Sequence, residues 1–108
     1  MYDFLKEVNF AISVCNQDGE IIYLNKKGSE TFADEGGMDL IGSNILDCHP
    51  EPSRSQLEEM MHSHKTNAYI KGEGLDKRLI YQTPIYESAI FRGYIECIIP
   101  LAEVSEIS

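Results

Sequence analysis

Basic residues are scarce in this sequence of 108 residues. It carries 9 lysines and arginines against 18 aspartates and glutamates, which gives a formal net charge of −9. Proteins that bind nucleic acids or anionic membranes contact phosphates through clustered lysine and arginine. The charge therefore argues against both kinds of partner, and the simplest role of the acidity is to keep a small domain soluble.

Long apolar runs are also missing. The longest are short segments such as Glu20–Leu24 and Ile95–Leu101, whereas a membrane-spanning helix needs about 18 apolar residues. At the N-terminus, Asp3, Lys6 and Glu7 interrupt what would have to be the apolar part of a secretion signal. We therefore expect a cytoplasmic protein.

Cysteines are few, and none forms a CxxC pair. The three cysteines, Cys15, Cys48 and Cys97, are widely spaced and odd in number. This spacing favours neither a structural zinc site nor a dithiol redox motif. We expect reduced thiols, with Cys15 and Cys97 buried and inert on strands.

The first part of the chain predicts a helix followed by a hairpin. Apolar spacing indicates a short helix over Met1–Glu7, and the alternation in Phe10–Cys15 indicates a strand. Asp18-Gly19 supplies the positive φ that a tight turn needs, so Glu20–Leu24 is the expected returning strand.

The middle of the chain predicts helices. Asn25 is expected to cap a helix at Lys26–Phe32. Shorter helical pieces are expected at Met38–Ile41 and Asn44–Cys48. The longest helix is predicted for Ser53–Lys65, where Ser53 and Gln56 match a capping box. Its apolar face is expected to carry Leu57, Met60, Met61 and His64.

The last part of the chain predicts three strands, at Asn67–Lys71, Lys77–Ile85 and Phe91–Leu101. We therefore predict one α+β domain over residues 1–108. It would have an N-terminal helix at 1–8, a core at 9–101 and a tail at 102–108. The core would be a five-stranded antiparallel sheet, with short helices and one longer helix packed on one face.

Three segments, in this order, resemble PAS domains. Ile12–Asn25 (ISVCNQDGEIIYLN) is similar to the first PAS hairpin. Leu40-Ile41-Gly42 resembles the step before the ligand-facing helix, and Tyr86 with Arg92–Glu96 resembles the last hairpin. The resemblance covers nearly the whole chain and implies the PAS fold.

A narrower resemblance concerns Asp47-Cys48-His49-Pro50, with Ser53 opening the long helix. It is similar to a Cys-His-Pro variant of PAS domains found beside hemerythrin-like domains in prokaryotes. Glu51-Pro52 departs from that pattern, because a Pro-Lys-like pair is expected there.

The PAS resemblance implies a sensory and signalling module rather than an enzyme. Such a module holds a small ligand or cofactor between sheet and helices and forms homodimers. No output domain is encoded in this sequence, and the ligand is not identified by it. The residues expected to line the pocket are Ile45, Cys48, His49, Leu57, Met60, Met61, His64 and Tyr81.

A haem or metal sensor is the first alternative. In haem-binding PAS domains the axial histidine comes from the long helix, which makes His64 the candidate ligand. Cys48 and His49 could contact a metal ion, but adjacent side chains seldom converge on one ion. The structural interpretation is a loop whose prolines, Pro50 and Pro52, separate two helices.

Two further alternatives stay open. The segment Gly42–Asp47 is similar to the flavin-binding step of PAS photoreceptors, but Ile45 stands where the reactive cysteine would be. This excludes covalent flavin chemistry and leaves non-covalent flavin open. The other alternative is a structural dimerisation domain whose own side chains fill the pocket.

Overall fold

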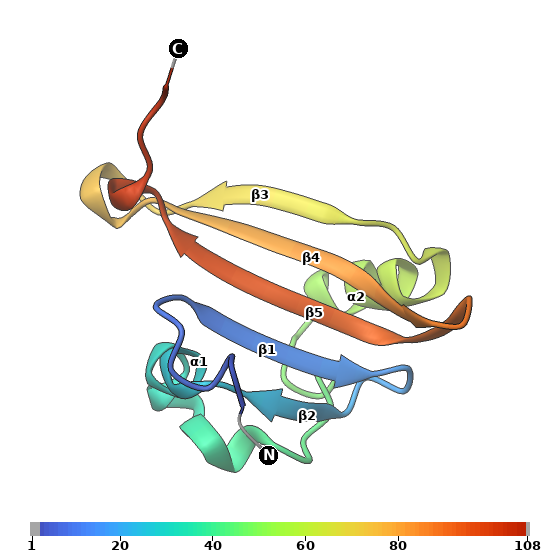
Figure 1. The fold of residues 1–108 in the computed structure, drawn as a ribbon. Coiled ribbons are helices and arrows are strands. Elements are labelled where there is room, and N and C mark those ends of the chain that lie inside the picture. The colour runs from blue at the N-terminus through green and yellow to red at the C-terminus, as the bar shows by residue number, and fades with distance from the viewer. Residues whose placement is uncertain (1–2, 108) are drawn as a thin grey trace.

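The chain forms a five-stranded antiparallel sheet in the computed structural model, which describes residues 3–107 (Figure 1). The strand order is β2-β1-β5-β4-β3, so the first and last strands lie side by side in the middle. This confirms the predicted sheet. The strands are β1 (Ala11–Asn16), β2 (Ile21–Leu24), β3 (Asn67–Lys71), β4 (Arg78–Glu87) and β5 (Ile90–Pro100).

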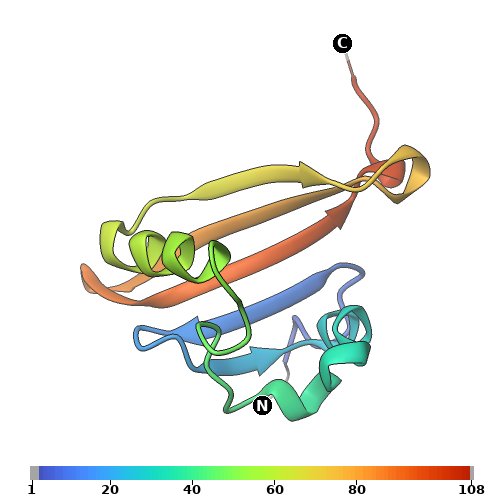
Figure 2. The ribbon, with the colours of Figure 1, turned by 180° about the vertical axis from the view of Figure 1, so that it is seen from behind.

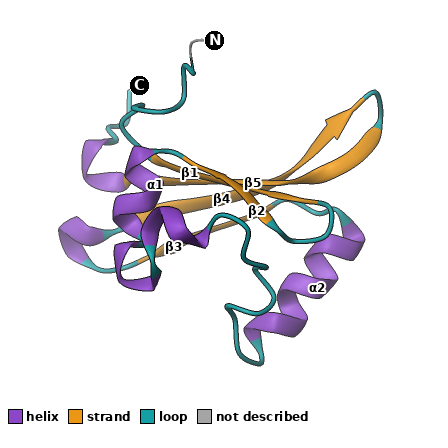
Figure 3. Ribbon diagram, turned by 90° about the horizontal axis from the view of Figure 1, so that it is seen from below, coloured by secondary structure: helices purple, strands orange, loops and turns teal. Residues whose placement is uncertain are grey.

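The helices α1 and α2 lie on one face of the sheet, and the N-terminal segment lies on the other (Figure 3). Seen from behind, α2 lies over the end of β5 near the β4–β5 turn, while α1 lies beside β1 and β2 (Figure 2). The helices are α1 (Lys26–Thr31) and α2 (Ser53–Ser63), with 3₁₀ helices η1 (Ala33–Glu35), η2 (Gly37–Leu40), η3 (Gly74–Asp76) and η4 (Leu101–Glu103).

The predicted β1–β2 hairpin is confirmed, and Asn16 organises its turn. The Asn16 Oδ1 atom accepts hydrogen bonds from the backbone N–H groups of Asp18 and Glu20, both at 3.0 Å. Gly19 adopts φ +85°, a conformation that residues with a Cβ rarely take. The Asp-Gly signal in the sequence therefore identified the right turn.

Two predicted helices are wrong. Asp3–Val8 forms a turn, in which the Leu5 N–H donates to Asp3 Oδ1 at 3.0 Å, and Met1 and Tyr2 lie outside the described residues. Asn44–Cys48 also forms turns. The Asn44 Oδ1 atom accepts from the Leu46 N–H, and the Asn44 carbonyl accepts from the Asp47 N–H, so these bonds stay local.

The predicted capping box of α2 is wrong as well. Pro52 occupies the N-cap, no side chain caps the helix, and Ser53 is already its first residue. The first-turn N–H groups find partners elsewhere. Arg54 N–H donates to the carbonyl of Pro50, and Gln56 N–H donates to that of Pro52. The Pro50 carbonyl thus satisfies one first-turn N–H, and the bond to Pro52 is the first regular bond of the helix.

Asn25 joins three separate segments through its side-chain amide. It is 1% exposed. Its Oδ1 accepts from the N–H groups of Ile12 (2.9 Å) and Gly28 (2.8 Å). Its Nδ2 donates to the carbonyls of Leu5 (3.1 Å) and Phe10 (2.9 Å). The predicted cap of α1 is confirmed, and the same side chain also holds the N-terminal segment against β1.

The apolar core lies on the helix-covered face of the sheet. Ala11, Ile98 and Ile80 are directly opposite one another on β1, β5 and β4, and all three are buried. Phe32, just after α1, packs against them. Burial of these side chains is the main favourable term that holds the first helices on the sheet.

Replacement of Asn25 by alanine should lower the free energy of unfolding by about 3 kcal/mol, because two buried and two partly buried backbone groups lose their partners at once. Urea unfolding followed by circular dichroism measures the change. Asn9→Ala, at an exposed position, is the control and should change stability by less than about 0.5 kcal/mol. Equal stability of the two variants would contradict the role given to Asn25.

Candidate functional site

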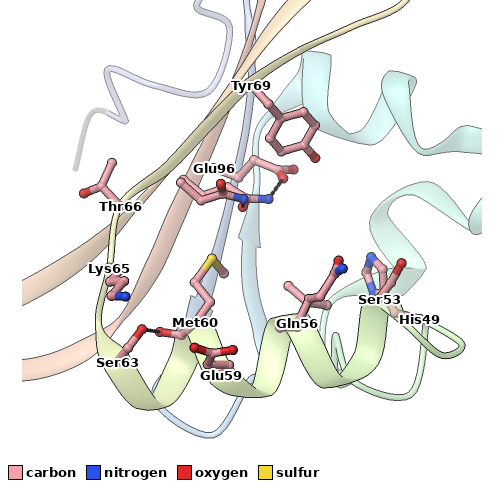
Figure 4. Close-up of a pocket in the computed structure, with 13 residues that line it drawn as sticks. His49, Ser53, Gln56, Glu59, Met60, Ser63, Lys65, Thr66, Tyr69 and Glu96 are labelled. Atoms are coloured by element: carbon pink, nitrogen blue, oxygen red, sulfur yellow. Dashed lines mark hydrogen bonds between the residues drawn. The ribbon is translucent and has the colours of Figure 1, made fainter.

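A pocket of about 630 Å³ opens between α2 and the sheet (Figure 4). It is bounded by α2 on one side and by β3, β4 and β5 on the other. Its lining residues are His49, Ser53, Gln56, Leu57, Glu59, Met60, Ser63, Lys65, Thr66, Asn67, Tyr69, Gln82 and Glu96. Most of these side chains are polar, which is unusual for the space between a helix and a sheet.

A row of three polar side chains crosses the floor of the pocket. Asn67, Gln82 and Glu96 stand opposite one another on β3, β4 and β5. Asn67 Nδ2 donates to Gln82 Oε1 at 3.1 Å, and Gln82 Nε2 donates to Glu96 Oε2 at 2.6 Å. The row therefore ends at a carboxylate on a central strand of the sheet.

The charge of Glu96 acts on its neighbours. Burial raises the pKa of the Tyr69 hydroxyl, and the negative charge of Glu96 raises that pKa further. Burial also raises the pKa of the Cys97 thiol, again with a contribution from Glu96. Within residues 3–107, Glu96 forms no ion pair. The positive charge of Arg78 acts on Tyr69 in the opposite direction and lowers its pKa. Glu96 is thus the one carboxylate among the floor residues that line the pocket.

The helix side of the pocket is packed loosely. No residue of α2 is fully buried. Leu57 and Met60 provide the apolar part of this wall. In Figure 4 the Met60 side chain extends from α2 toward the polar row. A loosely packed helix can change position at low energetic cost, since little apolar contact is lost.

Tyr94 fastens the C-terminal end of α2 to the sheet. This β5 residue is 4% exposed, and its hydroxyl lies 2.7 Å from the carbonyl oxygen of Met60 and 2.8 Å from that of Lys65. The single phenolic proton is donated to one carbonyl at a time. Burial raises the pKa of Tyr94, so the hydroxyl keeps its proton at neutral pH.

His64 is part of this attachment and not of the pocket lining. It follows α2 in the left-handed conformation, with φ +59°. Its ring stacks on Phe91, with centroids 3.8 Å apart and planes 11° apart, and meets Tyr86 edge-on at 6.3 Å. The predicted position on the apolar helix face is wrong, because the helix ends one residue earlier.

The structure brings together only part of the predicted pocket set. His49, Leu57 and Met60 line the pocket, whereas Ile45, Cys48, Met61, His64 and Tyr81 are absent from its lining. Tyr81 lies on the opposite face of the sheet from Gln82, because successive strand residues alternate. Binding of a ligand by any of these residues stays a prediction.

The sequence analysis missed the polar row and Tyr69. Alternation along β4 and β5 places Gln82 on the face of Ile80, and Glu96 on the face of Ile98. That period-2 signal is present in the sequence. The sequence pattern does not give the register between the strands, and the register decides that the side chains of Asn67, Gln82 and Glu96 meet.

His49 has a fixed ring orientation. Its Nδ1 lies 2.6 Å from the carbonyl oxygen of Ile45. A carbonyl oxygen only accepts, so Nδ1 carries the proton and Nε2 of the neutral ring is an acceptor. The neighbouring Cys48 is exposed, and no group of three or more His, Cys, Asp or Glu in residues 3–107 could hold a metal ion.

Across residues 3–107, none of the helices combines the length and apolar character required to cross a membrane.

No protein-family model and no curated protein matched the sequence. Among solved structures, the Vibrio cholerae Aer2 receptor matches with a TM-score of 0.64 at 13% identity, covering 86% of this chain and 95% of that chain. The PAS domain of histidine kinase ThkA matches with a TM-score of 0.65 at 21% identity, covering 83% and 97%. The PAS domain of BvgS from Bordetella pertussis matches with a TM-score of 0.62 at 18% identity, covering 94% and 82%.

These matches show that the chain has the PAS fold, as the sequence analysis predicted. The Cys-His-Pro subgroup stays a prediction.

Removal of the Tyr94 hydroxyl should loosen the end of α2 without disturbing the sheet. In Tyr94→Phe, we expect amide hydrogen exchange in residues 60–65 to rise by about tenfold. The reason is that opening this end of α2 no longer requires the hydrogen bond of the Tyr94 hydroxyl to be broken. Exchange in β1 should stay unchanged. Tyr81→Phe, which removes an exposed hydroxyl, is the control. Equal protection of residues 60–65 in both variants would show that Tyr94 does not fasten the helix.

Proposed function

We propose that this chain is a sensory module that binds a small ligand in the pocket between α2 and the sheet and passes the binding event to a protein partner. The pocket of about 630 Å³ carries this proposal. It has the size of a small-molecule site, and it joins a polar floor to a mixed wall in which Leu57 and Met60 are apolar. The PAS fold of sensor-kinase domains is consistent with a signalling role.

The attachment of α2 supports signalling by displacement. Tyr94 and the His64–Phe91 stack hold its C-terminal end, and no α2 residue is fully buried. A ligand that contacts both α2 and the sheet would favour one position of the helix over others. Occupancy of the pocket would therefore change the surface that α2 presents to a partner.

Binding without catalysis is the activity we propose. A nucleophile requires a base oriented by a third group, all converging on one point. Cys48 is exposed and outside the pocket lining, while His49 bonds to a backbone carbonyl. The adjacent pair thus lacks the arrangement that a thiolate mechanism needs.

Haem is the second candidate ligand, and it draws support from His49 rather than His64. Aer2 is described as a dual PAS-heme oxygen sensor. His49 lines the pocket with Nδ1 bonded to a carbonyl, a common arrangement for metal-binding histidines. Against haem stands the polar floor of Asn67, Gln82 and Glu96. Non-covalent flavin has no specific observation in its favour.

A second copy of this chain is the partner we propose for the outer face of the sheet. This face, opposite to α2, carries an apolar group of side chains on β3, β4 and β5. Ile70 is 63% exposed and Tyr81 42% exposed. Two-fold symmetry lets the same apolar face cover itself. The outer apolar face consists of Ile70, Leu79, Tyr81, Ile95, Cys97 and Ile99.

Filling the pocket should abolish ligand binding. We expect native mass spectrometry of the purified protein to show a co-purified small molecule, which is lost in Leu57→Trp because the indole occupies the pocket. Glu58→Trp, on the same helix but outside the pocket lining, should retain it. The visible spectrum of the same sample should show no Soret band, and a Soret band would favour haem. Absence of any added mass in the unmodified protein would argue for a structural domain.

Charge on the outer apolar face should separate the proposed dimer. The double variant Ile70→Glu, Tyr81→Glu places two like charges from each copy in the interface, so we expect a monomer by light scattering after size exclusion. Leu75→Glu, at an 87% exposed position in η3, is the matched control and should stay dimeric. A monomeric unmodified protein, or a dimeric double variant, would contradict this interface.

A further inference from the structure

The polar row on the pocket floor has a defined direction. An ionised carboxylate only accepts hydrogen bonds, so the amide nitrogen of Gln82 must face Glu96. The carbonyl of Gln82 then faces Asn67, whose own amide nitrogen must turn toward it. The amides are neutral and hold each other in place. Glu96 is therefore the charged end of an oriented row.

The second oxygen of this carboxylate is left for a ligand. Glu96 Oε2 accepts the bond from Gln82, and within residues 3–107 no hydrogen bond or ion pair involves Oε1. Lys65 also lines the pocket, yet it forms no ion pair with Glu96 or Glu59 in the described part of the chain. The lining contains two carboxylates, Glu59 and Glu96, and one ammonium group, Lys65, so with a neutral His49 ring its net charge is negative.

The surroundings of Glu96 suit a cation with an apolar body. The Tyr69 hydroxyl lies near enough to Glu96 for the negative charge to raise its pKa, and in Figure 4 the Met60 side chain extends from α2 toward the polar row. An aromatic ring attracts a cation placed over its face. Met60 and Leu57 offer apolar contact to an attached alkyl group. An anion would instead meet two carboxylates and one lysine.

We propose that the ligand of this pocket is a small organic cation with N–H donors, such as an alkylguanidinium or alkylammonium compound, whose charged end binds the Glu96 carboxylate. The inference rests on the proposed function, since it specifies the ligand of the same site. Charge-assisted hydrogen bonds to a partly desolvated carboxylate would supply both affinity and selectivity.

Three matched probes test the ligand class on the unmodified protein. Butylguanidinium is a cation, butylurea is its neutral isostere, and butyrate is an anion of similar size. Titrations followed by two-dimensional ¹H–¹⁵N NMR should show butylguanidinium shifting the signals of Asn67, Gln82 and Glu96. Butylurea should bind at least about tenfold more weakly, because it lacks the charge, and butyrate should leave these signals unchanged.

Glu96→Gln tests the residue. It keeps the size of the side chain and a hydrogen-bonding partner for Gln82, and its NMR spectrum reports whether the fold is retained. Affinity for butylguanidinium should fall by about tenfold or more. Glu106→Gln makes the same change of net charge in the exposed C-terminal segment and should bind like the unmodified protein.

Each contrary result would overturn a different part of the proposal. Equal affinity of butylguanidinium for Glu96→Gln and the unmodified protein would overturn the role of Glu96. Butylurea or butyrate binding as tightly as butylguanidinium, or no shift from butylguanidinium at millimolar concentration, would overturn the ligand class. The proposed function would survive these results if native mass spectrometry still shows a co-purified molecule lost in Leu57→Trp, and would fail with them if it does not.

Discussion

The buried amide of Asn25 is the interaction on which the rest of this structure depends. Its four hydrogen bonds reach the N-terminal segment, β1 and the first turn of α1. The N–H groups of Ile12 and Gly28 are in buried hydrogen bonds, so they would be left without a partner if the Asn25 amide were removed. Asn25 thereby ties the N-terminal segment and α1 to β1, and β1 in turn pairs with the central strand β5, which carries Tyr94 and Glu96. The pocket floor on β3, β4 and β5 is therefore joined to the part of the molecule that Asn25 organises through the pairing of β1 with β5.

The other side of the pocket is built differently. α2 is fastened at its C-terminal end by Tyr94 and by the stack of His64 on Phe91. Along the rest of its length it contributes side chains to an open space rather than to a packed core. The pocket thus has a hydrogen-bonded polar floor on the sheet and a helical wall that is held mainly at one end.

The individual strands, the first hairpin and the cap of α1 could be predicted because each depends on residues close together in sequence. Asp18-Gly19 needs only its own turn, and Asn25 caps the helix that directly follows it. The candidate site was predicted only in part, through His49, Leu57 and Met60. His64 was misplaced because α2 ends at Ser63 and His64 itself is left-handed. The spacing of apolar residues, on which the prediction was based, does not indicate where a helix ends. The capping box failed for a similar reason, since the carbonyl of Pro50 satisfied one first-turn N–H group instead.

The sequence by itself determined the order of the five strands and of α1 and α2, their approximate bounds, and the acidic net charge of the chain. These are consequences of local pattern and of total charge. Only the tertiary structure decided that Gln82 and Glu96 face α2 while Tyr81 faces away, and that Asn67 completes their row. Strand alternation tells which residues share a face within one strand. It takes the register among β3, β4 and β5 to decide which polar side chains meet, and that register is set by contacts between residues far apart in the chain.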